Sequence, residues 1–241
     1  MNKKNFSNIP DSGIYNANPE RYSQLVNELY SNNAPVTLGP EYAEFITNNQ
    51  LRLLIRLARY KFVARLLNRT DQVLEVGSGT GLGALFLAQH CAQVSGLEIK
   101  QTELEEAQAI NRRTNVTFSD TDFFDLPEDR VFDVIVGLDV IEHLNHTLAD
   151  KFIKKASRLL PAHGMLILGT PSLYSYPYQG ELSRASHEKC YDLPELVDLF
   201  RPEFARTLSF SMNDEMVHTG HHKMAWYYFV IGVVPQPNKK T

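Results

Sequence analysis

Residues 72–86, QVLEVGSGTGLGALF, hold an apolar run followed by alternating glycines. The run at 72–76 has the length and composition of a buried strand. Gly77, Gly79 and Gly81 follow it directly, and glycine permits a tight turn and a close approach of the backbone to a ligand. A helix is predicted after the turn, and the free N–H groups at its start would face that ligand. This stretch therefore predicts a strand, a turn and a helix built around a binding site.

Strands and helices continue to alternate downstream. Further strands are predicted at 92–99, 115–120, 131–139 and 165–170, with helices at 100–114 and 147–161. This alternation favours an α/β fold whose parallel sheet has helices on both faces. After a helix at 193–200, two strands follow each other at 205–212 and 224–234 without a helix between them. Such a pair is usually antiparallel, so the sheet is expected to end in reversed strands.

The N-terminal part has a different pattern. Residues 1–40 resemble an irregular arm with one short helix at 19–30, and the pattern turns helical from Glu41 to Arg69. We interpret 1–69 as a helical extension that covers the substrate, 70–235 as the main domain and 236–241 as a tail. The basic side chains of the extension lie mostly off its apolar face, and we interpret them as a solvated surface: Arg52, Arg56, Arg59, Lys61, Arg65 and Arg69.

Composition excludes several classes of protein. The 241 residues carry a net charge of −4, which argues against a nucleic-acid partner. The two cysteines have no metal-type spacing, which suits a reducing compartment. The N-terminus lacks the apolar core of a signal peptide, and the longest apolar run, 225–234, is too short to span a membrane. A cytoplasmic protein is expected.

Two acidic residues narrow the choice of ligand. Glu75 directly precedes the first glycine, where a carboxylate repels a pyrophosphate and attracts an ammonium group. Glu98 ends the second strand, where it can accept hydrogen bonds from both hydroxyls of a ribose. Residues 79–84 also match the G-x-G-x-x-A pattern of dinucleotide-binding proteins. Together the acids favour S-adenosyl-L-methionine, with S-adenosyl-L-homocysteine as product, over a nicotinamide or flavin dinucleotide.

The segments LEVGSGTG (74–81), GLEI (96–99), SDTDFFDLP (119–127) and FDVIVGLDVIEHL (132–144) resemble the motifs of class I S-adenosylmethionine-dependent methyltransferases. LLPAHGMLILGTPS (159–172) resembles a fifth motif, although Ala162 and His163 precede a single glycine. The resemblance covers about 70–235 and implies a Rossmann-like, seven-stranded sheet with an antiparallel last strand. In the third motif, Asp122 and Phe123 would flank the adenine. The implied cofactor-binding residues are Glu75, Gly77, Ser78, Gly79, Thr80, Gly81, Glu98, Ile99, Asp122, Phe123 and Asp139.

The segment DVIEHLNH (139–146) follows the fourth strand, at the edge where ligands bind in such sheets. On a helix, Asp139, Glu142, His143 and His146 would share one face. The segment and the downstream pattern around His187 resemble the small-molecule O-methyltransferases, which include ubiquinone-pathway and glycan-modifying enzymes. His146 is expected to be peripheral, because it lies a turn further from the strand end.

Three interpretations of this segment are open. His143 can be a general base, with His187 facing it across the site, because a neutral histidine suits removal of a hydroxyl proton near pH 7. Asp139 and Glu142 can be a helix cap, which leaves His143 unexplained. Asp139, Glu142, His143 and His187 can instead hold a divalent metal ion, as E-x-x-E-H relatives do. We favour the base, place the cap second and the metal third.

Residues 171–192 are too long for a simple connection, and we interpret them as an insertion that forms the acceptor pocket or its lid. They contain His187, Arg184 and the tyrosines Tyr174, Tyr176, Tyr178 and Tyr191. A zinc site at His218, His221 and His222 is less favoured than a polar loop, because no cysteine accompanies them.

The expected activity is methyl transfer to a hydroxyl of a small molecule or glycan. The alternatives are an N-methyltransferase, a non-catalytic cofactor-binding module that acts through a partner at 52–69, and a nicotinamide-dependent oxidoreductase. The aromatic segment Tyr227–Phe229 leaves a homodimer open.

Overall fold

A computed structural model describes residues 18–33 and 35–236. The chain divides into two compact units, Met1–Thr37 and Leu38–Thr241. In the first unit, α1 (Pro19–Asn32) begins after Asn18, whose side chain accepts a hydrogen bond from the Arg21 N–H, and none of its residues is buried. This helix confirms the one predicted at 19–30.

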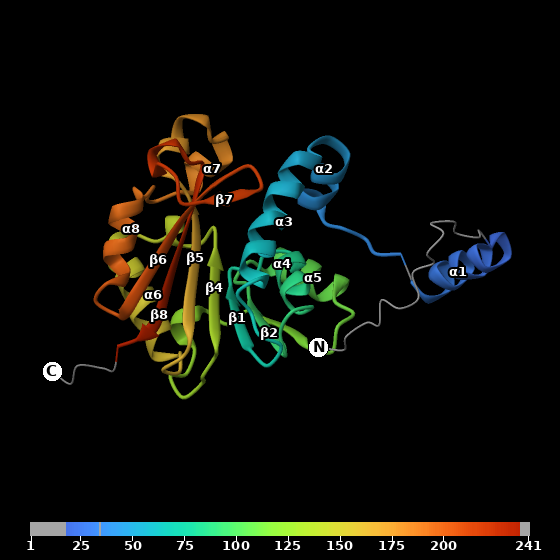
Figure 1. Ribbon diagram of the computed structural model, residues 1–241, viewed down its shortest axis with the longest axis horizontal. Helices are drawn as coiled ribbons and strands as arrows, with labels where there is room; N and C mark the ends of the chain where they lie inside the picture. Colours follow the sequence, from blue (N-terminus) through green and yellow to red (C-terminus); the bar gives the residue numbers. More distant parts are fainter. Residues whose placement is uncertain (1–17, 34, 237–241) are drawn as a thin grey trace, which may run out of the picture. The chain divides into compact units, whose positions relative to one another are not determined.

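The second unit is built on one sheet of eight strands in the order β3-β2-β1-β4-β5-β8-β6-β7 (Figure 1). β1 to β5 pair in parallel, and β8 runs antiparallel to both β5 and β6. The strands are β1 (Gln72–Val76), β2 (Gln93–Leu97), β3 (Val116–Ser119), β4 (Val134–Leu138), β5 (Met165–Pro171), β6 (Phe204–Asn213), β7 (Met216–His218) and β8 (Tyr227–Pro235). The predicted parallel sheet with reversed final strands is confirmed.

Helices cover both faces of this sheet, as Figure 1 shows. Leu74 and Ile135 face a core that includes Phe152 and Phe200, whereas Val73 and Val134 face a second core that includes Val63 and Leu87. Strands that are buried on both faces read as continuous apolar runs, which is why their positions were predictable. The helices are α2 (Pro40–Asn48), α3 (Gln50–Ala64), α4 (Leu82–Leu87), α5 (Gln101–Ile110), α6 (His146–Arg158), α7 (Glu181–Ser186) and α8 (Leu193–Phe200).

Two elements differ from the prediction in a simple way. The expected seven strands are eight, because β7 pairs with β6 through a turn at Asp214, whose φ is +50°. The helical region expected at 41–69, in which no internal boundary was predicted, is two helices, because Asn49 has φ −146° and its side chain accepts from the Arg52 N–H to start α3. Neither the turn at Asp214 nor the helix boundary at Asn49 interrupts the apolar pattern of the sequence.

The segment 139–146 is not one continuous helix, so Asp139, Glu142, His143 and His146 do not share the face that helical spacing would give them. Short 3₁₀ helices connect several of the described elements, and one of them, η3 (Ile141–His143), ends at Leu144 in extended backbone. Asn145 then starts α6 by accepting from the Leu148 N–H. Asp139 has φ +58° and caps no helix, so the capping interpretation is wrong. Others are η2 (Phe123–Asp125), η4 (Leu173–Tyr178) and η5 (His222–Met224).

The insertion 171–192 is largely ordered into η4 and α7. The aromatic segment Tyr227–Phe229 lies in β8, between β5 and β6, and its three side chains are buried. This placement overturns the expectation of a dimer surface there. In the described part of the chain, no helix combines the length and the apolar character that crossing a bilayer requires.

Candidate active site

The glycine turn after β1 has the geometry that its sequence predicts. Gly77, Gly79 and Gly81 have φ angles of +69°, +52° and +84°, which favour glycine. A Cβ on Gly81 would lie 2.8 Å from the Cβ of Ala107 and 2.8 Å from the Cζ of Phe118. The turn is therefore fixed by packing as well as by backbone conformation.

Glu98 follows β2 and is held rigidly beside this turn. Its Oε2 accepts from the Gly79 N–H at 2.9 Å, and its Oε1 accepts from the Lys100 N–H at 2.8 Å. Each oxygen keeps a second lone pair, so the buried carboxylate can still accept from a diol. The neighbouring Ile99 side chain is 70% exposed, which leaves an apolar surface beside the diol position.

Asp122 and Phe123 of the third motif lie at the start of η2, and the two side chains differ in exposure. Asp122 is exposed, and its Oδ1 accepts from the Phe124 N–H at 2.8 Å. Phe123 is buried, with its ring centroid 4.4 Å from that of Phe152. The Phe123 ring belongs to the core, so only its backbone remains for a cofactor contact.

Glu75 is a buried carboxylate, and among the described residues neither of its oxygens has a partner with hydrogen-bond geometry. Burial raises its pKa to about 8, the nearby Tyr60 hydroxyl of α3 opposes that rise, and Glu98 adds to it. The hydroxyls of Ser78 and Thr80 are also buried without a partner. Unpaired buried polar groups are costly and rare in folded proteins. Their gathering around one turn indicates that a polar ligand completes this site.

Arg59 of α3 also lies at this edge of the sheet, which the sequence did not indicate. Its Nη1 is 2.6 Å from the Asp139 Oδ2, and its guanidinium carbon lies 3.8 Å from the centroid of the Tyr227 ring. The interpretation of Arg59 as part of a solvated face is therefore wrong. Its spacing of four from Ile55 and from the buried Val63 was the available signal, because all three share one side of α3.

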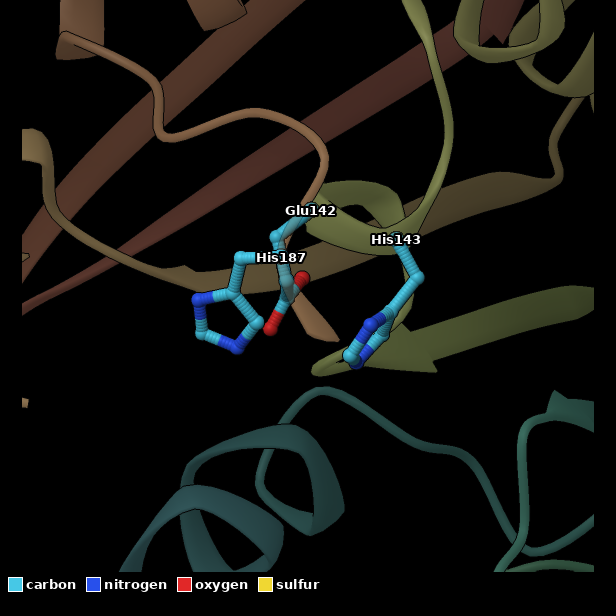
Figure 2. A group of neighbouring side chains, drawn as sticks. All are labelled: Glu142, His143 and His187. Carbon is cyan, nitrogen blue, oxygen red and sulfur yellow. The ribbon is translucent and has the colours of Figure 1, made fainter. Parts of the chain in front are cut away.

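Glu142, His143 and His187 form a cluster in which one ligand atom from each lies within 4.8 Å of the others. Figure 2 shows the Glu142 carboxylate between the two imidazole rings, with all three side chains turned the same way. The ring centroids of His143 and His187 are 5.1 Å apart, and the planes meet at 76°. The predicted histidine pair is thus brought together from η3 and from the segment after α7.

The hydrogen bonds of the histidines define their chemistry. The His143 Nδ1 lies 2.8 Å from the Ser186 carbonyl oxygen, so it donates, and the Nε2 of the neutral ring keeps a lone pair. The buried His187 Nδ1 has no partner. Burial lowers the pKa of His187, and the neighbouring His143 lowers it further. Both rings can serve as a proton acceptor or as a metal ligand.

Glu142 links the cluster to β5 and to the insertion. Its Oε2 accepts from the Thr170 hydroxyl at 3.0 Å, while its Oε1 has no partner. Its carbonyl oxygen accepts from the backbone N–H groups of Glu188 and Lys189 at 2.8 and 3.0 Å. Burial and the charge of Asp139 raise its pKa well above the ordinary value. Asp139 itself lies outside the cluster, because its carboxylate pairs with Arg59.

The other candidate residues make local contacts outside the Glu142, His143 and His187 cluster. His146 is exposed and lies 3.4 Å from Asp150, as expected. The His222 Nε2 is 3.1 Å from the Asp192 Oδ1, and the His218 Nδ1 accepts from the Gly220 N–H. Within the residues that the structure describes, the histidines of this loop form no metal-binding cluster. In the insertion, the Tyr174 hydroxyl donates to Asp192, and Tyr178 packs edge-on against Trp226.

A family model and several known proteins are similar to parts of this chain. Residues 73–164 match a family model described as a methyltransferase domain. Among curated proteins, the chain is similar to the ubiquinone biosynthesis O-methyltransferase of Rickettsia akari, with 29% identity over 101 residues that cover 41% of this chain and 39% of that enzyme. The matched part of the chain corresponds to between 34% and 53% of the length of such curated relatives.

Solved structures share the fold at low identity. A chain from the complex of the Haloferax volcanii Trm112 methyltransferase activator with a methyltransferase superposes with a TM-score of 0.60 at 15% identity, covering 83% of this chain and all (100%) of that one. N-methyltransferase NodS of Bradyrhizobium japonicum, crystallised with S-adenosyl-L-homocysteine, gives 0.56 at 16% identity, covering 76% of this chain and 88% of that one. These matches confirm the predicted Rossmann-like architecture.

Proposed function

We propose that the chain carries a class I S-adenosylmethionine-dependent methyltransferase domain, and that the whole protein transfers the methyl group of S-adenosyl-L-methionine to a hydroxyl of a small molecule or glycan. The observation that carries this proposal is the unpartnered Glu75 carboxylate beside three left-handed glycines. The cofactor's ammonium group pairs with Glu75, and its ribose hydroxyls donate to Glu98. S-adenosyl-L-homocysteine is the product.

The remaining contacts follow from the same edge of the sheet. The backbone of the turn at Gly77, Gly79 and Gly81 approaches the cofactor, and the free hydroxyls of Ser78 and Thr80 supply donors. The exposed Ile99 and Asp122, with the Phe123 backbone, flank the adenine. Asp139 keeps one carboxylate oxygen without a partner for the cofactor's polar end.

His143 is the proposed general base. The acceptor oxygen attacks the methyl carbon, the C–S bond breaks with its electron pair going to sulfur, and the hydroxyl proton passes to the His143 Nε2. The Ser186 carbonyl holds the ring in the tautomer that this step needs. His187 completes the pocket as a neutral partner, because its lowered pKa keeps it uncharged near pH 7.

A divalent metal ion is the second candidate for activating the acceptor. The close approach of Glu142, His143 and His187 favours it, because one carboxylate and two imidazoles are a common ligand set. The unpaired Glu142 Oε1 and the free His143 Nε2 fit such an ion. When bound, it would lower the pKa of an acceptor hydroxyl.

Two further alternatives concern the acceptor and the partner. NodS is named as an N-methyltransferase, and an amine acceptor would need no base, because its free form is already nucleophilic. The Trm112 complex shows a methyltransferase with a protein activator. A protein partner of this chain, including a non-catalytic role through one, is therefore an alternative to a chain that acts alone on a small molecule.

Isothermal titration with S-adenosyl-L-homocysteine tests the cofactor site. We expect wild-type protein to bind, and Glu98→Ala to weaken binding by about tenfold or more, since two charge-assisted hydrogen bonds are lost. Glu105→Ala is the matched control, because Glu105 is exposed on α5 and bonds only the nearby Gln101 side chain. Absence of any binding to the wild type would refute the proposed function.

Transfer of a labelled methyl group to hydroxyl and amine acceptors tests the chemistry. We expect His143→Ala to lower kcat about 10²- to 10⁴-fold, the usual contribution of general base catalysis, while the matched variant His146→Ala changes it little. Activity that survives exhaustive chelation excludes the metal. Loss on chelation and recovery with added divalent ions assigns the cluster to a metal. Transfer to amines alone would replace the O-methylation proposal.

A further inference from the structure

Asp139 has an unusual backbone conformation at a sensitive position. It follows the last residue of β4 and precedes η3, which carries Glu142 and His143. Its φ of +58° lies in the left-handed region, which costs a non-glycine residue about 1 kcal/mol or more. The direction in which η3 leaves the sheet depends on the backbone of Asp139 and Val140, and Asp139 is the one of the two in the left-handed region, so contacts must hold it there.

Arg59 makes the strongest of those contacts. The Asp139 N–H donates to the Gly169 carbonyl oxygen at 2.8 Å, which fixes one side of the peptide. On the other side, the Asp139 Oδ2 accepts from the Arg59 Nη1 at 2.6 Å. The Arg59 side chain is 19% exposed and the Asp139 side chain 33%. The second guanidinium neighbour is the Tyr227 ring, at 3.8 Å. A guanidinium held between a carboxylate and an aromatic ring has little freedom to move.

The same contacts converge on the catalytic cluster. A Cβ on Gly169 would lie 2.5 Å from the Tyr227 hydroxyl, so the absence of a side chain there lets the Tyr227 ring pack over β5. The next residue, Thr170, donates to the Glu142 carboxylate at 3.0 Å. Arg59 and Tyr227 thus reach the turn from α3 and β8, both outside the stretch 73–164 that matches the family model.

We propose that Arg59 is a positioning residue: its ion pair keeps Asp139 in the left-handed conformation and so sets how η3 presents Glu142 and His143 to the acceptor. The catalytic meaning of this role rests on the proposed function. The geometric role does not, and it makes α3 a part of the active site that the methyltransferase-domain match leaves out. The other charged groups near the guanidinium are Arg56 and Glu142.

The test uses the full chain and compares Arg59→Met, Arg59→Lys and the double variant Arg59→Met/Asp139→Gly. The readout is the set of ring C–H NMR signals of His143 and His187 at one fixed pH, assigned with single His→Gln variants. We expect these signals to move in Arg59→Met, to move less in Arg59→Lys, and to return toward wild type in the double variant. Glycine adopts the left-handed conformation freely and leaves no unpaired carboxylate behind.

Arg52→Met is the matched control, because Arg52 is exposed on α3 and its guanidinium lies over the Phe45 ring instead. It should leave the ring signals in place. Once an acceptor substrate is identified, Arg59→Met should lower kcat about 10²-fold, as small misplacements of catalytic groups do. The dissociation constant of S-adenosyl-L-homocysteine should change by less than about threefold.

Two results would overturn the positioning role. One is a set of ring signals that does not move in Arg59→Met, or that does not return in the double variant. The other is a loss of cofactor affinity as large as the loss of kcat, which would make Arg59 a cofactor ligand. If Arg59→Met does not fold, Arg59→Lys and Arg59→Lys/Asp139→Gly carry the same comparison. Because the NMR comparison needs no turnover, a failed activity assay contradicts the proposed function and leaves the positioning role standing.

Discussion

Among single side chains, Glu75 links cofactor binding to pH. At pH 7 a carboxyl with a pKa of about 8 is mostly protonated, and a bound ammonium group would hold it ionised. We therefore predict that binding of S-adenosyl-L-homocysteine at pH 7 releases close to one proton, and that this number falls as the pH is raised through 8. Isothermal titration in buffers of different ionisation enthalpy measures it.

Glu75→Gln supplies the control for that experiment. The amide has the same shape without a titratable proton, so proton release should disappear. Glu105→Gln, on the exposed side of α5, should leave the release unchanged. Binding without proton release in the wild type would show that Glu75 is not the partner of the ammonium group.

The sequence identifies a site residue most reliably when the local chain fixes its position. Glu75 and Glu98 were predictable, because each stands at a strand end beside the glycine turn. Arg59 was not, because its partner Asp139 lies 80 positions away in the chain and only the tertiary fold joins them. Phe123 shows an intermediate case: the motif predicts the loop, but packing against Phe152 turns the ring into the core.

Among helices and strands, the turn between β1 and α4 gives the sharpest stability prediction. Gly81→Ala places a Cβ at φ +84° and 2.8 Å from Ala107 and Phe118. We expect a loss of about 2–4 kcal/mol in the free energy of unfolding, from backbone strain and overpacking together. Urea denaturation followed by circular dichroism measures it.

Gly180→Ala is the matched substitution. Gly180 precedes α7 with φ −65°, and an added Cβ would meet nothing within 4 Å. Its free energy of unfolding should change by less than about 1 kcal/mol. Equal losses in the two variants would mean that the left-handed turn contributes nothing special to stability.

The helices and strands differ in how well the sequence could predict them. β1, β4 and β5 were predictable because burial on both faces leaves a continuous apolar run, whereas β2 and β3 contain polar residues and are buried only in part. The shared face that helical spacing would give at 139–146 does not form, because side-chain spacing carries no information on the left-handed Asp139 or the extended Leu144. Only Asn145, a favourable N-cap, signalled the true start of α6. β7, with three residues, is too short for any periodic signal.

For the molecule as a whole, the costly polar groups lie at one edge of the sheet. Glu75 and Glu142 are both buried, and the pKa of each is raised in the folded state. Between the unfolded value near 4.5 and the folded value, the folded protein binds more protons than the unfolded chain. The free energy of unfolding must then fall as pH rises through this window. His187, with its lowered pKa, contributes in the opposite direction but is only partly buried.

We therefore predict that the ligand-free protein loses stability from about pH 5 to pH 8. The slope is up to about 1.4 kcal/mol per pH unit for each proton held only by the folded state. A saturating concentration of S-adenosyl-L-homocysteine should flatten the curve, since its ammonium group compensates the Glu75 charge. Glu75→Gln should flatten it without ligand, whereas Glu105→Gln should not. Urea denaturation across this pH range measures all four curves, and a ligand-free stability that rises up to pH 8 would contradict the raised pKa values on which the prediction depends.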